Sequence, residues 1–250
     1  MITGRELFRG KALFAIKGGG ECLKQRIELL DLWRSLCLCV MIVFHLCYDL
    51  ALFGVISMEA MASLPARLLS YDVGGCFILI SGICLRFSRD PVRRGFFVFC
   101  AGLLVSLVTG LVKQPVLFGI LQCIGICMML CGVLRKKLEG RLGVGFALIC
   151  LALFAVTWWA TSTITVNIRF LFPIGLRTGD FYSADYYPLF PWLFLYLIGM
   201  VFGKKLDEHR ESAVVQWRFP RWMTFPGRHS LLIYLLHQPV LYGLTWLMFG

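Results

Sequence analysis

The sequence predicts an all-α integral membrane protein, a bundle of about seven transmembrane helices. Of its 250 residues, 59% are apolar and only 16% are charged, which is the composition of a chain that lies in a bilayer. Long apolar segments recur along the chain, separated by short polar connections. Positive charge is high in one connection and low in the next, as expected when successive connections lie on opposite sides of a membrane.

The apolar segments define the expected spans, because a transmembrane helix needs about 20 mostly apolar residues. Together they leave no room for a separate soluble domain. We expect a cytoplasmic leader, residues 1–27, which lacks a convincing signal-peptide cleavage site, and one membrane domain, residues 28–250. In chain order, the expected spans are residues 32–56, 68–86, 95–112, 115–134, 143–161, 188–203 and 230–249.

The 25 Lys and Arg residues fall mainly on one side of the predicted bundle. Twenty lie in the leader and in the second, fourth and sixth connections, whereas the other three connections hold four. Basic residues favour the cytoplasmic side, so we expect a cytoplasmic N-terminus and an extracytoplasmic C-terminus. The net charge of +11 is therefore explained first by the orientation of the chain in the membrane, and it does not indicate a nucleic-acid partner.

The first span carries ionisable side chains that a simple membrane anchor would avoid. A charge near the bilayer centre costs at least about 2.5–3.5 kcal/mol, so such residues usually face a protein interior and serve a function. His45 and Asp49 are four residues apart on one helical face, where the carboxylate could orient the imidazole. We interpret them as a catalytic pair. The alternative is that the two side chains only satisfy each other inside the bundle.

Two further candidates lie at the ends of the membrane domain. Asp31 and Arg34 are three residues apart at the inner boundary of the first span, where an ion pair could fix the helix or receive an anionic ligand. His237 in the last span precedes Gln238 and Pro239, and the proline should kink the helix and free a carbonyl. His237 is therefore either a catalytic residue lining a cavity or a histidine bonded near that carbonyl.

Three polar residues are candidates for substrate binding. Gln122 in the fourth span could bind substrate or join helices. Asp185 and Tyr186 lie in the long fifth connection, where carboxylates and aromatic rings together suit a polyol or an amino sugar. The alternative for these two is an interfacial aromatic belt with solvated acids. The eleven cysteines contain no paired CxxC elements, so neither a metal site nor a disulfide framework is expected.

Several of these stretches together resemble the heparan-alpha-glucosaminide N-acetyltransferase family, in particular its compact bacterial members of the DUF1624 type. The resemblance covers about residues 26–245, and Ser35 stands where that family usually has glycine. It implies a bacterial inner (plasma) membrane as the location. The shared stretches are the D-x-x-R of Asp31 and Arg34, then FHLCYDL, FILISGICLRFSR, FGILQCIGIC, DYYPLFPWLFLYLIGMVFGK and GRHSLLIYLLHQPVL.

The resemblance implies transfer of an acetyl group from cytoplasmic acetyl-CoA to an extracytoplasmic acceptor, which we expect to be a sugar, glycan or glycolipid. His45 could carry the acetyl group as an acetyl-imidazole, or act as general base while both substrates are bound. Coenzyme A is anionic, so its phosphates should bind basic residues of the inner side. The candidate ligands for coenzyme A are Arg86, Arg89, Arg93, Arg94, Arg135 and Lys136.

A proton-coupled transporter is the main alternative, because it would also place His, Asp and Arg inside a bundle. Seven spans without visible inverted repeats are less typical of that class. A structural scaffold is a third interpretation, against which the buried ionisable residues argue. An acyltransferase should consume acetyl-CoA in detergent without a gradient, whereas a transporter should not. Membrane lipid is an expected partner, and a homo-oligomer is left open.

Overall fold

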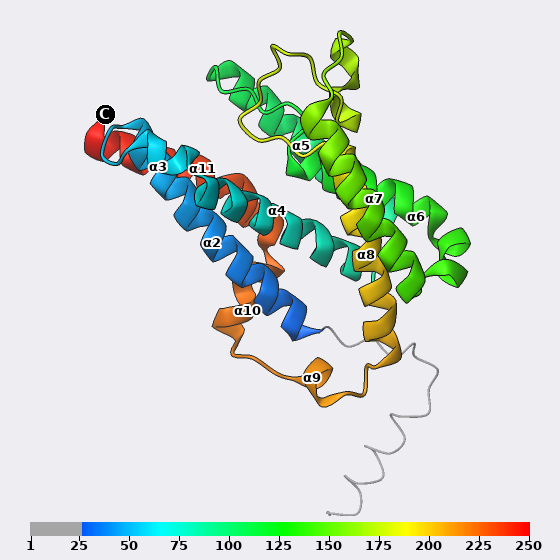
Figure 1. Cartoon of the computed structure of the whole chain (residues 1–250). Helices are drawn as coiled ribbons and strands as arrows, with labels where there is room; N and C mark the ends of the chain where they lie inside the picture. Colours follow the sequence, from blue (N-terminus) through cyan, green and yellow to red (C-terminus); the bar gives the residue numbers. More distant parts are fainter. Residues whose placement is uncertain (1–26) are drawn as a thin grey trace, which may run out of the picture.

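The computed structural model describes residues 27–250, which fold into a bundle of helices (Figure 1). The predicted all-α membrane bundle is thereby confirmed, whereas nearly all of the predicted leader lies outside the described residues. The long helices are α2 (Glu28–Leu52), α4 (Leu64–Leu85), α5 (Pro91–Leu111), α6 (Ile120–Leu138), α7 (Val144–Thr163), α8 (Leu189–Glu208) and α11 (Ser230–Phe249). Short elements connect them: α3 (Met58–Ala62), η1 (Glu139–Arg141), η2 (Arg169–Ile174), α9 (Ala213–Gln216) and α10 (Arg221–Arg228).

Within residues 27–250, six helices are long and apolar enough to cross a bilayer, namely α2, α4, α5, α7, α8 and α11. The remaining predicted span, residues 115–134, corresponds to α6, which begins five residues later at Ile120. Its last turn is basic, so its uncharged part is shorter than a full crossing. The first turn of α6 packs against Gly102, near the middle of α5. α6 therefore starts inside the bundle rather than at its surface.

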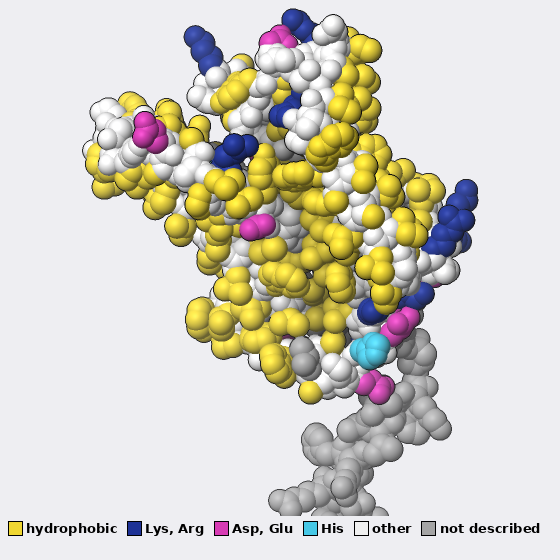
Figure 2. All heavy atoms as spheres, viewed as in Figure 1, with side chains coloured by type: hydrophobic (Ala, Val, Ile, Leu, Met, Phe, Trp, Pro, Cys, Tyr) yellow, Lys and Arg dark blue, Asp and Glu magenta, His cyan; other side chains and the backbone are white. Residues whose placement is uncertain are grey.

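Successive long helices alternate in direction from α2 to α11, and this brings the basic connections together (Figure 1). We call this side of the bundle the basic end; it holds the first turns of α2, α5, α7 and α11 and the last turns of α4, α6 and α8. Arg86 pairs there with Glu139 at 2.7 Å and with Asp207 at 2.9 Å. Figure 2 shows apolar side chains over the middle of one face and most charged ones toward its two ends. The cytoplasmic placement of the basic end stays a prediction.

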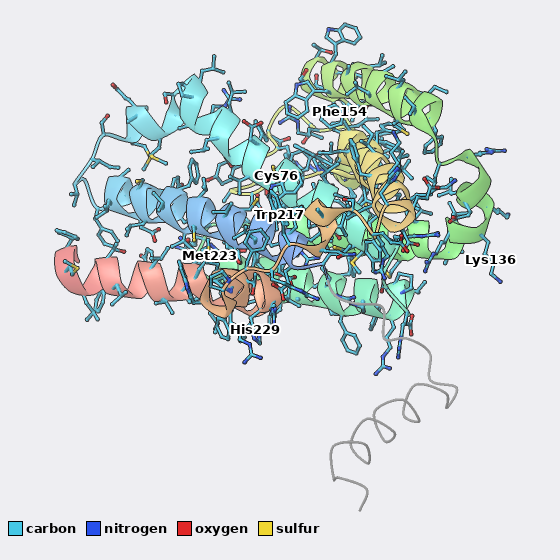
Figure 3. All side chains as sticks on the ribbon, turned by 90° about the horizontal axis from the view of Figure 1, so that it is seen from below. Cys76, Lys136, Phe154, Trp217, Met223 and His229 are labelled. Atoms are coloured by element: carbon cyan, nitrogen blue, oxygen red, sulfur yellow. The ribbon has the colours of Figure 1, made fainter. Side chains whose placement is uncertain are left out.

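α2 and α11 run side by side in the same direction (Figures 1 and 3). Contacts between the two helices follow the same order along each of them. Near the start of α2, Ser35 accepts a hydrogen bond from Gly227, just before α11, and further along His45 faces His237. The start of α2 and the end of α11 therefore lie at opposite ends of the bundle. That the two termini of the domain lie on opposite sides of a membrane stays a prediction.

Glycines bring α4 and α8 into direct backbone contact. A Cβ added at Gly82 would meet the Tyr196 carbonyl, and one added at Gly199 would meet the Leu79 carbonyl, so neither position has room for a side chain. Such close approach at small residues is typical of packed membrane helices. Three cysteines on one face of α6 are also buried, each 0–1% exposed, as packing predicts: Cys123, Cys127 and Cys131.

Candidate functional site

A cavity of about 440 Å³ lies between α2, α4, α5, α6, α10 and α11. Three arginines line it toward the basic end, and they come from three different helices: Arg34 from α2, Arg94 from α5 and Arg228 from α10. Its other walls include Ile120, in the first turn of α6, and Tyr234 of α11. We call the part of the cavity between these three arginines its mouth; the rest of its lining is largely apolar.

The predicted pair of Asp31 and Arg34 forms at this mouth. Nη1 of Arg34 lies 3.2 Å from Oδ1 of Asp31, and its Nη2 donates to Sγ of Cys84 at 2.7 Å. Nε of Arg228 lies 3.7 Å from Oδ2 of the same aspartate, which is only 2% exposed. One buried carboxylate thus aligns two guanidinium groups that line the cavity, and Arg94 adds a third positive charge.

Ser35 fixes the segment that carries Arg228. Its hydroxyl donates to the Asp31 carbonyl at 3.0 Å and accepts the Gly227 N–H at 2.8 Å. Gly227 cannot carry a side chain, because an added Cβ would meet the Asp31 carbonyl. Ser35 therefore adds a hydrogen bond between α2 and the end of α10.

The first turn of α11 also faces the cavity. His229, Ser230, Leu231 and Leu232 line it, and no side chain caps this helix N-terminus. The N–H groups of a first helical turn carry partial positive charge and favour bound anions. Together with the three arginines, this turn gives the mouth the chemistry of a phosphate-binding site.

The two predicted catalytic histidines meet beyond Tyr234. The rings of His45 and His237 lie 4.9 Å apart between centroids. Nδ1 of His237 lies 2.6 Å from the Tyr234 carbonyl oxygen, which can only accept, so we assign the hydrogen to Nδ1. Nε2 of His237 is buried and has no hydrogen-bond partner among residues 27–250. That nitrogen is therefore left with a free lone pair beside His45.

The structure pairs Asp49 with α11 rather than with His45. Asp49 is 1% exposed, and its Oδ1 accepts a hydrogen bond from Nε2 of Gln238 at 2.9 Å. Residues four apart share a helical face, but here both turn toward α11, where Gln238 offers an amide donor. Asp49 Oδ2 and Gln238 Oε1 are buried without partners in the described part of the chain. Two adjacent polar layers thus join α2 to α11: the first is His45 with His237, and the second is Asp49 with Gln238.

Asp185 does not line the cavity, but it contacts the cavity wall from the predicted outer side. Its connection folds back onto the first turn of α6, where Oδ2 accepts the Ile120 N–H at 3.3 Å. Burial raises the pKa of Asp185 to about 6, and the hydrogen bond from Ile120 partly opposes that shift. Ile120 lines the cavity together with Tyr234. A carboxylate of the outer connection is therefore bonded to the backbone of a residue that lines the cavity.

Two residues predicted to bind substrate make contacts within the fold. Oε1 of Gln122 accepts the Gly119 N–H at 2.7 Å and its Nε2 donates to Ser106 at 3.1 Å, so this side chain caps α6. The Tyr186 hydroxyl donates to the Phe172 carbonyl at 2.6 Å. Neither Gln122 nor Tyr186 lines the cavity. Both instead hold the backbone around Asp185 and the start of α6.

The residues predicted to bind coenzyme A fall into three groups. Arg86 is held in the ion pairs described above, and Arg135 donates to the carbonyls of Arg86 and Ser88 at 2.8 and 3.2 Å, so both close the basic end. Arg94 lines the cavity. The other three are exposed at the same end: Arg89, Arg93 and Lys136.

Sequence reasoning missed three residues of this site: Arg228, Tyr234 and Gln238. Helical spacing offered a signal, because Tyr234 stands three residues before His237 and four before Gln238, which places all three near one face. Among residues 27–250, no group of three or more His, Cys, Asp or Glu side chains could hold a metal ion.

The chain matches the sequence profile of a family described as heparan-alpha-glucosaminide N-acetyltransferase, catalytic, over residues 26–239. The matched region contains His45 and His237, and it contains the three arginines that line the cavity. Neither the curated proteins nor the solved structures gave a match. The profile confirms the resemblance read from the sequence motifs: this integral membrane protein belongs to the heparan-alpha-glucosaminide N-acetyltransferase family of transmembrane acetyltransferases.

Proposed function

We propose that the protein transfers an acetyl group from acetyl-CoA, bound at the basic end, to a sugar or glycan acceptor on the opposite side of a bacterial inner membrane. One observation carries this proposal. The cavity begins among arginines and reaches Tyr234, whose carbonyl holds His237 against His45. Neither of these histidines lines the cavity, but His237 is bonded to a residue that does. Phosphate-binding chemistry in one part of the cavity and a pair of imidazoles beside Tyr234 suit an anionic thioester donor. The positive-inside rule supports a cytoplasmic basic end, where acetyl-CoA is available.

The donor phosphates would lie at the cavity mouth. Guanidinium groups bind phosphate through two parallel hydrogen bonds, and Arg34, Arg94 and Arg228 present three of them around one opening. Asp31 orders two of these side chains before a ligand arrives, which lowers the entropy cost of binding. The thioester end of the donor would then follow the apolar wall of α6 toward Tyr234.

The reaction would take place at the histidine pair. In direct transfer, the acceptor hydroxyl or amine attacks the thioester carbonyl carbon while a histidine, such as His237 through Nε2, takes its proton. The imidazolium then returns the proton to the departing coenzyme A sulfur. In the two-step route, His45 attacks first, coenzyme A leaves, and the acceptor displaces the acetyl-imidazole. Both routes give the acetylated acceptor and coenzyme A.

The acceptor would approach from the outer connection. Asp185 already accepts the N–H of Ile120, a residue of the cavity wall, and its carboxylate would suit the hydroxyl or amine donors of a sugar. Tyr186 would act indirectly in this proposal, since its hydroxyl holds the same connection through Phe172. The acceptor and donor sites would thus meet near Tyr234.

Purified protein in detergent tests the proposal through release of the coenzyme A thiol from acetyl-CoA. We expect release without an ion gradient when a glycan or glycolipid extract is present, and mass spectrometry should find an acceptor heavier by one acetyl group. Acetyl-CoA labelled in its acetyl group, given without acceptor, separates the two routes, because label retained on the parent but not on His45→Ala identifies the acetyl-imidazole. Absence of any acetyl-CoA turnover, with gradient-driven solute uptake in vesicles, would favour the transporter instead.

A further inference from the structure

A strongly amphipathic helix, α10, lies across the basic end. Thr224 and Gly227 are buried against α2, whereas Trp222 is 75% exposed and Phe225 is 58% exposed on the outward side. Trp217, four residues before the helix, is 54% exposed. Large aromatic side chains on an outward face, within a polar segment, are typical of helices that lie in a membrane interface.

Basic residues flank these aromatic side chains. Arg218 and Arg228 share one carboxylate, Glu28, at 3.3 and 3.6 Å, and Arg221 is exposed at the start of α10. The segment therefore keeps a net positive charge on its outer side. Anionic lipid headgroups attract such residues by about 1 kcal/mol each near the membrane surface.

The position of α10 places these side chains at the membrane boundary. Glu28 is the first residue of the spanning helix α2, and its carboxylate accepts the Phe219 N–H at 2.9 Å, just before α10. The spanning helix α11 begins two residues after α10 ends. Figure 3, which looks onto the basic end, shows Trp217, Met223 and His229 spread along this segment. α10 thus lies level with the ends of two spanning helices.

We propose that α10 is an interfacial helix that binds anionic phospholipid headgroups of the leaflet at the basic end, and that this contact orders one wall of the cavity. Trp222 and Phe225 insert at the boundary between headgroups and acyl chains, and Arg221 contacts the phosphates. The last two residues of α10, Gly227 and Arg228, line the cavity, so lipid bound to the helix stabilises that wall. The lipid contact does not depend on the proposed transfer reaction.

Charge favours lipid over a second copy of this chain as the partner of α10. Two copies that met through this face would bring their arginines together, and like charges across an interface repel. An anionic headgroup instead neutralises the arginines while the aromatic side chains enter the apolar layer.

Native mass spectrometry of protein released from nanodiscs tests the lipid contact. The discs contain phosphatidylglycerol and phosphatidylcholine in equal amounts, and the retained ratio of the two lipids is compared between variants. We expect Arg221→Gln to lower the retained phosphatidylglycerol about five-fold, the equivalent of about 1 kcal/mol, and Arg221→Lys to restore it. Arg141→Gln is the matched control, because Arg141 is exposed at the same end but outside α10. An equal loss in Arg141→Gln would show that the whole basic end attracts lipid, and would overturn the proposal.

Hydrogen exchange tests the ordering of the cavity wall without relying on activity. Backbone amides of residues 221–232 should exchange more slowly in discs that contain phosphatidylglycerol than in phosphatidylcholine alone. Replacing Trp222 and Phe225 by alanine should remove that difference, and since both side chains are exposed, the variant should still fold. Equal exchange in the two lipids would overturn the proposal. So would a dimer that Trp222→Ala dissociates, because a second copy would then occupy this face.

Discussion

Two helix pairs in this bundle are held together in opposite ways. α4 and α8 meet backbone to backbone at Gly82 and Gly199, where no side chain fits. α2 and α11 meet through His45 with His237 and Asp49 with Gln238, and three of these four side chains keep a buried polar atom without a partner in the described residues. Buried polar groups without partners cost stability, so they persist where function needs them. The difference distinguishes a helix pair packed through its backbone from the pair at which we propose that the reaction takes place.

The largest effect should come from the histidines of the polar interface. His45→Ala and His237→Ala should each lower kcat by roughly 10²–10⁴-fold, because a base or nucleophile is lost. Release of coenzyme A thiol at saturating acetyl-CoA measures this. His209→Ala, at an exposed histidine after α8, should keep the parent rate. If a well-folded His237→Ala protein also keeps the parent rate, the polar side chains between α2 and α11 serve packing alone. The two helix pairs would then not differ in function.

Substitutions where α4 packs against α8 should change the stability of the protein rather than its catalytic rate. Gly199→Ala forces a Cβ into the Leu79 carbonyl, so its free energy of unfolding should fall by about 1–3 kcal/mol. Gly110→Ala is the control, since Gly110 lies in a helix with no atom within 4 Å of its added Cβ. That variant should be neutral or slightly more stable. Thermal denaturation in detergent compares the two, and equal effects would mean that close packing does not distinguish α4 and α8.

The second polar layer should matter less than the first. Asp49→Asn can still bond with Gln238 but loses the negative charge, so we expect a folded protein whose kcat falls about ten-fold, as for loss of one charge-assisted hydrogen bond. Steady-state rates and melting temperatures of Asp49→Asn and His45→Ala, measured together, test this order. A larger loss in Asp49→Asn would make the carboxylate, and not the histidines, the centre of the interface.

The smallest effect should appear at the cavity mouth, between the two helix pairs. Arg94→Gln should raise the KM for acetyl-CoA about five-fold with little change in kcat, because it removes one charged contact with the donor. The difference from the parent should shrink at high salt. The neighbouring Arg93→Gln is the control, since Arg93 is exposed but does not line the cavity. Equal KM values in parent and Arg94→Gln would remove this residue from the donor site.

Hydropathy and charge predicted the helices and the basic end, but they placed the start of α6 five residues early. Residues 115–119 are apolar enough to resemble a helix, yet Phe118 has a φ of +59° and the Val116 N–H bonds to the side chain of Thr109. Hydropathy depends only on residue type, so it does not predict such a backbone conformation. It therefore counted as a span a helix that begins inside the bundle.

Periodicity found which side chains share a face, but not which helix that face meets. His45 and His237 were each identified alone, and their contact depends on the parallel packing of α2 and α11. The basic residues show the same limit, because nothing in the sequence distinguishes Arg86, which closes the basic end, from Arg94, which lines the cavity. Both distinctions require tertiary contacts between residues far apart in the chain.

The position of Ile120, the first residue of α6, bears on how the proposed acetyl transfer would respond to a membrane potential. The Ile120 N–H binds Asp185 of the outer connection, while Ile120 also lines the cavity that opens at the basic end. A membrane potential falls across the low-dielectric layer between two conducting sides, and in the predicted orientation Ile120 and Asp185 belong to that layer. A unit charge moved across the whole potential does work of about 2.3 kcal/mol per 100 mV. The acetyl group leaves coenzyme A without the electron pair of its bond to sulfur, so its outward transfer and the inward transfer of one proton move equal charges in opposite directions. Complete acetyl transfer through this wall would therefore be electroneutral, and its equilibrium would not depend on voltage.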